Sequence, residues 1–453
     1  MNLTNLYTPS SHEKPVRRHN RRCGAVYVLV LGMGMLVSVM VLGVLINNRI
    51  QLRSTAQSGD SLYAETLAES AVDYAIVTLN ANSVWRTTYV NNVESATVAF
   101  GGGTISFKLA DEISANLTTA TTNPVRVYGI GRYGTATRVY SVRVEGTNAL
   151  TCLNTALMAG GNIAESNKSV IQASGYTLAT NGAFKGNLSG GSSTVNANVE
   201  AVGTITLNSA TITGTSTTAV PARLMPVSTV IDTYAAMGTS IAYSSIPAGI
   251  IQNVVISPAS NPYAATALNL KGIYVIDCGG SNLVITHCRI AGTLVILNPG
   301  SGSSIGTGTG ASDQINWAPA ISNYPCLLVN GNMTIAWSSS SGATLNETDL
   351  SAGIYNFNPV GTPYPYPSGT SNILTLDTYP SVIDGLVYVS GNVVGKANYP
   401  AINQLIVGGN YDPVQDNATF NYKGNYLASP PPGFRGGGTL KAVPASWHWE
   451  SMP

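Results

Sequence analysis

The side chains that could carry out chemistry are few in this chain of 453 residues. The densest group is Cys278, His287 and Cys288, which would supply only three metal ligands. Adjacent residues in a strand point to opposite faces, so His287 and Cys288 should not converge on one ion. We therefore predict no metal site and expect both cysteines to face a core. A Cys278–Cys288 disulfide is the alternative for an oxidising compartment, although these cysteines end successive strands.

The carboxylates are sparse and form no recognisable catalytic constellation. Enzymes that cleave polysaccharides on a parallel β-helix use clustered carboxylates on one exposed strand face. Asp412 and Asp416 could bind Ca²⁺ through turn oxygens, but ordinary Asx turns are the favoured interpretation. The sequence therefore predicts no catalytic residue, no cofactor and no enzymatic activity. The other aspartates of the second half stand alone or in turns: Asp277, Asp313, Asp349, Asp377 and Asp384.

The composition indicates a β-rich protein. Only 9% of the residues are charged, against roughly a quarter in an ordinary soluble domain, while 44% are hydrophobic. The 47 glycines and 23 tyrosines fit many short strands joined by tight turns. A net charge of +1 provides no general attraction to nucleic acid, so we predict no nucleic-acid partner.

One N-terminal segment is predicted to cross a membrane. Residues 25–46 carry no charge and no proline, and as a helix they would rise about 33 Å, enough for a bilayer core. A cleavable signal peptide has a shorter apolar region, so an uncleaved anchor is favoured. The positive-inside rule places the basic leader, residues 1–24, in the cytoplasm and the bulk outside it, in the periplasm or at the cell surface. The leader's charges near the helix are Lys14, Arg17, Arg18, Arg21 and Arg22.

The helix is expected to continue beyond the bilayer as a stalk, so that residues 25–84 form one unit. Between about residues 51 and 83 there is no proline, and Gly59 is the expected weak point. Glu65, Glu69 and Asp73 fall on one face at helical spacing. The opposite face is apolar and comprises Ala64, Leu67, Ala68, Ala71, Ala75 and Leu79.

A small antiparallel β unit is predicted for residues 85–150. Gly101-Gly102-Gly103 and Tyr133-Gly134-Thr135 suit turns between neighbouring strands. Short β-prone stretches lie on both sides of these turns. The expected strands are 96–100, 104–109, 125–130 and 138–144.

A short phrase recurs in residues 151–428, in which an apolar strand is followed by glycine and asparagine. Gly and Asn tolerate positive φ, so each phrase should turn the chain sharply. Strands spaced by about ten residues lie within 273–297. We predict an α+β fold in which this mainly-β domain is a β-solenoid, with a β-sandwich as the alternative. Residues 225–238 should form a short helix and 429–453 an irregular tail. The phrases end at Asn162, Asn332, Asn392 and Asn410.

Arg21-Arg22-Cys23-Gly24 precedes the apolar helix, and Leu67-Ala68-Glu69-Ser70-Ala71 follows it. This arrangement resembles the N-terminal region of type IV pilin-like proteins, and most closely the PilX-type minor pilins and related pilus-assembly proteins. In that family a prepilin peptidase cuts after the leader glycine, which implies cleavage between Gly24 and Ala25. Major pilins have glutamate at the fifth position of the mature chain, where this sequence has Leu29. The resemblance therefore implies a minor component rather than the main filament subunit.

These observations predict a structural role. We expect a minor pilin-like component of a type IV pilus or related secretion filament, which contacts the membrane and other pilus-assembly proteins through its N-terminal helix. The alternative is a membrane-anchored adhesin or carbohydrate-binding protein with surface glycans as partners. The aromatic tail Trp447-His448-Trp449 could seat a sugar or pack on its own domain. A polysaccharide-degrading β-helix enzyme is the least favoured interpretation.

Overall fold

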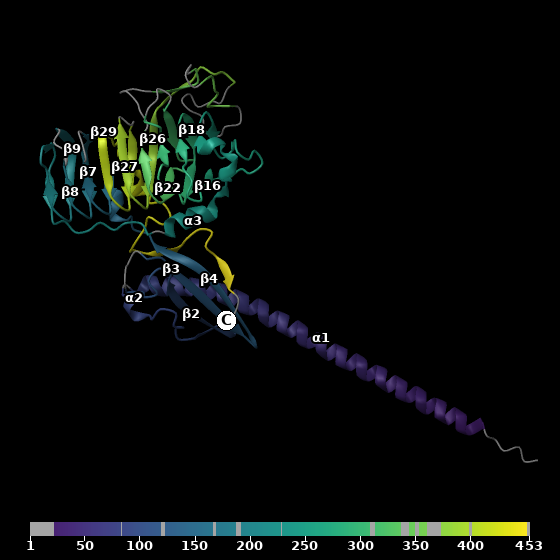
Figure 1. Cartoon of the computed structure of the whole chain (residues 1–453). Helices are drawn as coiled ribbons and strands as arrows, with labels where there is room; N and C mark the ends of the chain where they lie inside the picture. The colour runs from purple at the N-terminus through teal and green to yellow at the C-terminus, as the bar shows by residue number, and fades with distance from the viewer. Residues whose placement is uncertain are drawn as a thin grey trace, which may run out of the picture.

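The protein combines a long N-terminal helix, a small antiparallel sheet packed on the end of that helix, and a larger β domain beyond the sheet (Figure 1). We call the helix and the antiparallel sheet together the stalk unit. The computed structural model describes residues 22–82, 84–118, 123–165, 169–186, 192–227, 229–308, 313–336, 344–348, 353–359, 373–397 and 401–450.

The helix α1 (Arg22–Ala81) is continuous over 60 residues, or about 90 Å. Gly59, the expected weak point, does not end it. The predicted apolar face is confirmed, because Ala64 and Ala68 are fully buried whereas Glu69 is exposed. Most of the basic leader, residues 1–21, lies outside the described residues.

The antiparallel sheet of the stalk unit covers one face of α1. Its strands follow one another in sequence order and lie close to their predicted positions. Val72 and Leu79 of α1 share a buried cluster with Phe107, Val127 and Val142 of the sheet. A short helix, α2 (Trp85–Thr88), connects α1 to the sheet. The strands are β1 (Val98–Phe100), β2 (Gly103–Asp111), β3 (Val125–Tyr133) and β4 (Ala136–Gly146).

The C-terminal segment is more ordered than predicted. Two strands, β30 (Leu440–Ala442) and β31 (His448–Glu450), pair antiparallel with β4 and extend the stalk sheet. The prediction of an irregular tail over residues 429–453 was wrong for this part, because β4 offers a free edge that no local sequence pattern reveals. The β domain is therefore inserted between two strands of the stalk sheet.

The β domain is built from parallel strands. Each winding of the chain places its strands beside those of the next winding, so that three successive strands pair with the following three. The sheets of a β-sandwich are antiparallel, unlike these. The strands that pair in this way are β5 (Leu157–Ala159), β6 (Ile163–Ala164), β7 (Val170–Thr180), β8 (Phe184–Lys185), β9 (Ser193–Ala201), β10 (Ile205–Thr206), β11 (Ala210–Ile212), β12 (Ser216–Thr218), β13 (Thr239–Ser240), β14 (Ile250–Ile251), β15 (Val255–Ile256), β16 (Ile273–Asp277), β17 (Val284–Ile285), β18 (Cys288–Ala291), β19 (Thr293–Leu297), β20 (Ser304–Ile305), β21 (Ile315–Ala318), β22 (Leu327–Asn330), β23 (Met333–Ile335), β26 (Val382–Val389), β27 (Val393–Ala397), β28 (Ile402–Val407) and β29 (Tyr411–Thr419).

Several short elements accompany these ladders. The predicted helix of residues 225–238 is present as α3 (Thr229–Met237). Two antiparallel strands form a separate insertion. The remaining elements are η1 (Thr151–Asn154), η2 (Tyr243–Ser245), η3 (Pro247–Gly249), β24 (Thr344–Asn346), β25 (Thr378–Pro380) and α4 (Asn425–Ala428).

The windings are not stacked in the order of the sequence. The chain enters the middle of the β domain at β5 and β6 and reaches one end at β10, β11 and β12. Residues 219–238, which include α3, then cross to the opposite end, where β13 starts the second run of windings. This run finishes with β28 and β29, which pair with β5 and β6. We call this contact, between residues 402–420 on one side and residues 156–164 and 170–172 on the other, the seam.

The recurring Gly-Asn phrases lie in register on neighbouring windings. At the seam, the backbone N–H of Asn162 donates to Oδ1 of Asn410 at 2.7 Å. On the next two windings the contact repeats. The Asn410 N–H donates to Oδ1 of Asn392, and the Asn392 N–H donates to Oδ1 of Asn332, both at 2.8 Å. The asparagines therefore form a ladder that joins windings of both runs.

The glycines of these phrases lie where the chain turns, but positive φ does not explain why most of these positions hold glycine. Of the four that precede the asparagines, only Gly331 has positive φ. The others are required by close stacking, since a Cβ atom on Gly409 would lie 2.3 Å from Oδ1 of Asn392. A glycine expected to provide conformational freedom provides space instead.

Candidate functional site

The N-terminal half of α1 exposes a continuous apolar surface. Its large hydrophobic side chains between Val26 and Ile46 are 52–73% exposed. In the described part of the chain, Gly24–Ala81 is the one helix that is long and apolar enough to cross a membrane. Gly24 and Ala25, predicted to flank a cleavage site, are exposed near its start. A surface this apolar requires lipid or protein cover, which fits a membrane anchor.

The other half of α1 makes an unusually close contact with β3. A Cβ atom on Gly129 would lie 2.4 Å from the carbonyl oxygen of Ala68, and one on Gly131 would lie 2.3 Å from that of Ala64. Small residues on both sides therefore let the helix backbone approach the sheet backbone. This contact fixes the stalk sheet, and with it the attached β domain, to the helix.

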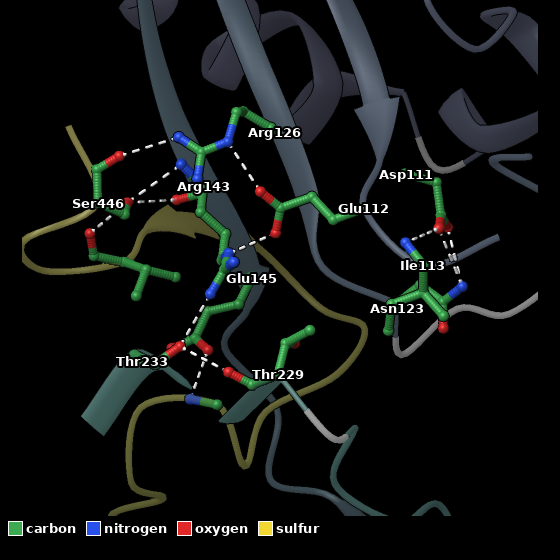
Figure 2. A network of polar contacts seen from close by, with 12 residues as sticks. Asp111, Glu112, Ile113, Asn123, Arg126, Arg143, Glu145, Thr229, Thr233 and Ser446 are labelled. Carbon is green, nitrogen blue, oxygen red and sulfur yellow. Dashed lines mark hydrogen bonds and ion pairs between the residues drawn. The ribbon is translucent and has the colours of Figure 1, made fainter. Parts of the chain in front are cut away.

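A polar network connects the stalk sheet to the β domain (Figure 2). Oε1 of Glu112 accepts from Nε of Arg126 at 2.8 Å, and its Oε2 accepts from Nε of Arg143 at 2.5 Å. Nη1 of Arg143 donates to the hydroxyl of Thr233 at 2.9 Å, and Thr233 belongs to α3 of the β domain. One carboxylate thus organises two arginines, and one of these reaches the neighbouring domain.

The C-terminal segment joins the same network. The Ser446 hydroxyl accepts the backbone N–H of Arg143 at 3.1 Å, and its carbonyl accepts from Nη1 of Arg126 at 3.3 Å. Figure 2 shows Ser446 beside these arginines, on the side away from Thr233. The junction therefore combines the sheet, α3 and the returning chain in one set of contacts.

Glu145 is a titratable group of this junction whose pKa departs strongly from its ordinary value. Its side chain is only 9% exposed, and burial raises its pKa to about 7, although the Gly433 N–H and Arg435 oppose this rise. The Gly433 N–H donates to Oε2 at 2.6 Å, and Nη1 of Arg435 lies 3.8 Å from Oε1. Glu145 therefore links β4 to the chain that leaves the β domain.

Glu145→Gln is expected to reduce the dependence of stability on pH. The folded-state pKa of Glu145 lies above the usual 4.5, so the native state binds this proton more tightly than the unfolded chain. The stability that this bound proton adds to the native state is fully present below the unfolded-state pKa. It is lost as the pH rises through about 7. The shift sets an upper limit of about 3 kcal/mol.

Thermal unfolding of the full chain in detergent, compared at about pH 5 and about pH 8, measures this effect. The glutamine variant should lose less stability between these values than the wild type. Asp384→Asn, which changes an exposed carboxyl group paired with Lys423, is the control and should keep the wild-type slope. Equal slopes for all three proteins would contradict the role of Glu145.

A cavity of about 600 Å³ lies at the junction. α1, α2, β4, α3 and the chain after Gly433 all contribute to its wall. The guanidinium group of Arg86 lies 4.5 Å from the centre of the Trp85 ring and donates to the carbonyl of Asn123 at 2.8 Å. Because residues of both units, among them Arg143, Thr233 and Gly433, border this space, a movement of the β domain against the stalk unit would change its shape. The charged residues that line it are Arg86, Arg143, Glu145 and Arg435.

The structure places the predicted cysteine and histidine residues in the interior of the β domain. Cys278 and Cys288 are free and buried in its core, so the alternative disulfide is not formed. Burial raises the pKa of the Cys278 thiol to about 11 and that of Cys288 further, which disfavours the reactive thiolates. His287 has a φ of 36° and lies between β17 and β18, so the prediction that it belongs to a strand was wrong.

Among the described residues, no group of three His, Cys, Asp or Glu side chains could hold a metal ion. Asp412 and Asp416 lie in the strand β29 rather than in a backbone turn. The strand pairs with β27 through both Asp412 and Pro413.

The aromatic tail packs on its own sheet. The rings of Trp447 and Trp449 have their centroids 5.3 and 4.4 Å from that of Tyr140 on β4. Tyr140 thus contacts both tryptophans, although 38% and 49% of their surfaces stay exposed. The tail secures β31 to the stalk sheet.

Sequence reasoning missed the junction residues Glu112, Arg143, Glu145 and Thr233. Their contacts join segments up to 303 residues apart, as between Arg143 and Ser446. A weak signal was present, because charged residues are rare in this chain and two of them, Arg143 and Glu145, stand two positions apart in a strand. Such spacing indicates a polar sheet face but does not identify what covers it.

Comparison with known proteins identifies no family. No protein-family model matches the chain, and no curated protein matches it. One solved structure found by the comparison is the crystal structure of the competence-associated pilin ComZ from Thermus thermophilus. It is 10% identical, with a TM-score of 0.27, over 87% of this chain and 98% of that chain.

Proposed function

We propose that the chain is a minor pilin-like structural component of a type IV pilus or a related secretion filament, with no enzymatic activity. The observation that carries this proposal is the division of α1 into two halves. One half exposes apolar side chains between Val26 and Ile46, and the other is covered by an antiparallel sheet through Gly129 and Gly131. The leader motif that ends at Gly24 supports pilin-type processing, and Leu29 supports a minor role.

In this proposal the β domain is a β-solenoid displayed outside the cytoplasm. Parallel pairing of successive windings supports the solenoid, and the basic leader supports the orientation. Two chain connections join the β domain to the stalk sheet, one before η1 and one after α4, and the Arg143–Thr233 hydrogen bond adds a third contact. The display domain is therefore expected to keep a fixed orientation on its stalk.

Mass spectrometry of the mature N-terminus tests the proposed processing. In cells with an active prepilin peptidase, the chain should begin at Ala25, because the peptidase cuts after the leader glycine. A Gly24→Val variant is the control and should keep its leader. A wild-type chain that retains residues 1–24 in such cells would contradict pilin-type processing.

A further inference from the structure

One end of the β domain has strand edges that no other strand covers. β10 pairs only with β8, and β11 and β12 pair only with β9, so their outer edges have no strand partner in the described part of the chain. We call residues 205–218 the end winding. Thr211 and all of residues 215–218 are exposed. The hydrogen-bonding groups of these edges therefore face outward.

At the opposite end of the β domain, β13, β14 and β15 also pair on one side only, with β16, β17 and β18, but inserted segments pack beside this end. Val255 of β15 is buried in a cluster with Leu345, Phe357 and Tyr379 of the inserted strands and their connection. The Tyr243 hydroxyl donates to the carbonyl of Asn282 at 2.6 Å and secures the chain beside β14. The two ends thus differ in cover, although both consist of short parallel strands.

The sequence of the end winding lacks the features that usually protect an exposed edge. Natural sheets guard such edges with lysine, proline, bulges or a covering segment, and repeat proteins end in polar capping repeats. Residues 201–220 contain no charged residue and no proline. Ile205, Leu207 and Ile212 are only partly buried against the core of the domain. This edge is therefore chemically able to accept another strand.

The seam shows how this molecule joins windings that are not consecutive in the chain. The Gly160 N–H donates to the carbonyl of Val407 at 2.8 Å, and the Tyr411 N–H donates to that of Asn162 at 2.9 Å. The paired asparagines Asn162 and Asn410 are separated by 248 residues. Backbone hydrogen bonds between aligned strands thus join windings that no turn connects, and the end winding has a strand edge of the same kind without a strand partner in the described part of the chain.

We propose that the end winding is an interface between two copies of this chain, in which β11 and β12 pair with the same strands of a second copy about a twofold axis. Two identical edges that meet in this way are antiparallel, so each N–H finds a carbonyl and the contact is self-complementary. The absence of charge removes repulsion between identical surfaces. In Figure 1 the β9 side of the domain lies far from the N-terminal end of α1, so the anchors of two paired copies lie at opposite ends.

The test uses the full chain reconstituted at one copy per nanodisc, because an embedded α1 cannot then bring two discs together. Mass photometry should show pairs of discs whose fraction rises with concentration. Thr217→Lys, which places two lysines at the interface, should weaken pairing about tenfold or more. Ser301→Lys is the matched control and should pair like the wild type, because Ser301 is exposed in a turn before β20, which is paired on both sides.

A second variant guards against a lysine effect on folding. Thr211→Cys combined with Thr217→Cys in a Cys23→Ser background should form disulfide-linked dimers between discs on oxidation, because antiparallel pairing of residues 210–218 with themselves places Thr211 opposite Thr217 of the other copy. Ser301→Cys in the same background should not. The four remaining native cysteines are free and buried, so they do not compete. Wild-type discs that stay single at every concentration, or equal pairing of the Thr217→Lys and wild-type chains, would overturn the proposal.

Discussion

Replacing Gly131 with alanine is expected to separate β3 from α1 and destabilise the stalk unit by about 3 kcal/mol or more. The new Cβ atom would lie 2.3 Å from the carbonyl oxygen of Ala64 and 2.4 Å from the backbone nitrogen of Ala68. Both are backbone atoms of a helix, so neither can rotate away as a side chain would. Gly129 makes a similar contact nearby, and a local shift at Gly131 must therefore move the whole strand.

Hydrogen exchange of the full chain in detergent, followed by mass spectrometry, measures this loss. Exchange should rise in β3 and β4 and stay unchanged in β16, β19 and β22 of the β domain. Gly59→Ala is the matched control, because a Cβ atom there meets nothing within 4 Å and alanine favours a helix by about 1 kcal/mol. A Gly131→Ala chain with wild-type protection would contradict this prediction, because it would show that the contact accommodates a methyl group without loss of stability.

Replacing Gly160 with alanine is expected to open the seam and cost about 3 kcal/mol. A Cβ atom at this position would lie 2.3 Å from the carbonyl oxygen of Gly408. The Gly160 N–H already donates to Val407 at 2.8 Å, so the two windings cannot part without losing that hydrogen bond. No turn of the chain connects these windings directly. We therefore expect the β domain to open first at the seam.

The same exchange measurement locates the effect of Gly160→Ala. Protection should fall in residues 157–164 and 402–420 together, while β16 and β19 stay protected. Gly175→Asn serves as the control, because Gly175 has a φ of 80° with nothing within 4 Å, and asparagine tolerates this conformation better than most residues. Loss of protection on only one side of the seam would contradict the idea that the two runs of windings stabilise each other.

Helical periodicity made α1 predictable. Its buried face recurs at helical spacing within a short stretch of sequence, and Leu67, Ala71 and Ala75 are all buried as expected. The strands near 273–297 were predictable for a related reason, because each apolar run is bounded by turn residues; they are present as β16, β17 and β19.

The order of the windings was not predictable. β28 pairs with β5, and β31 pairs with β4, across hundreds of residues that impose no local pattern on either partner. For the same reason the junction of Glu112, Arg143 and Thr233 was missed, although each residue is polar and visible in the sequence. Pairing between distant segments depends on which edges are left free, and that is known only once the other strands are in place.

The sequence by itself determined a long apolar helix, an amphipathic continuation of it and a β-rich remainder, because helical and strand periods are properties of neighbouring residues. It also placed the Gly-Asn phrases at turns. Only the tertiary structure decided that these glycines make room for the next winding. It also decided that β28 and β29 pair with β5 and β6, and that the end winding has no strand on its outer side in the described part of the chain. Each of these depends on distances between backbones that local sequence does not encode.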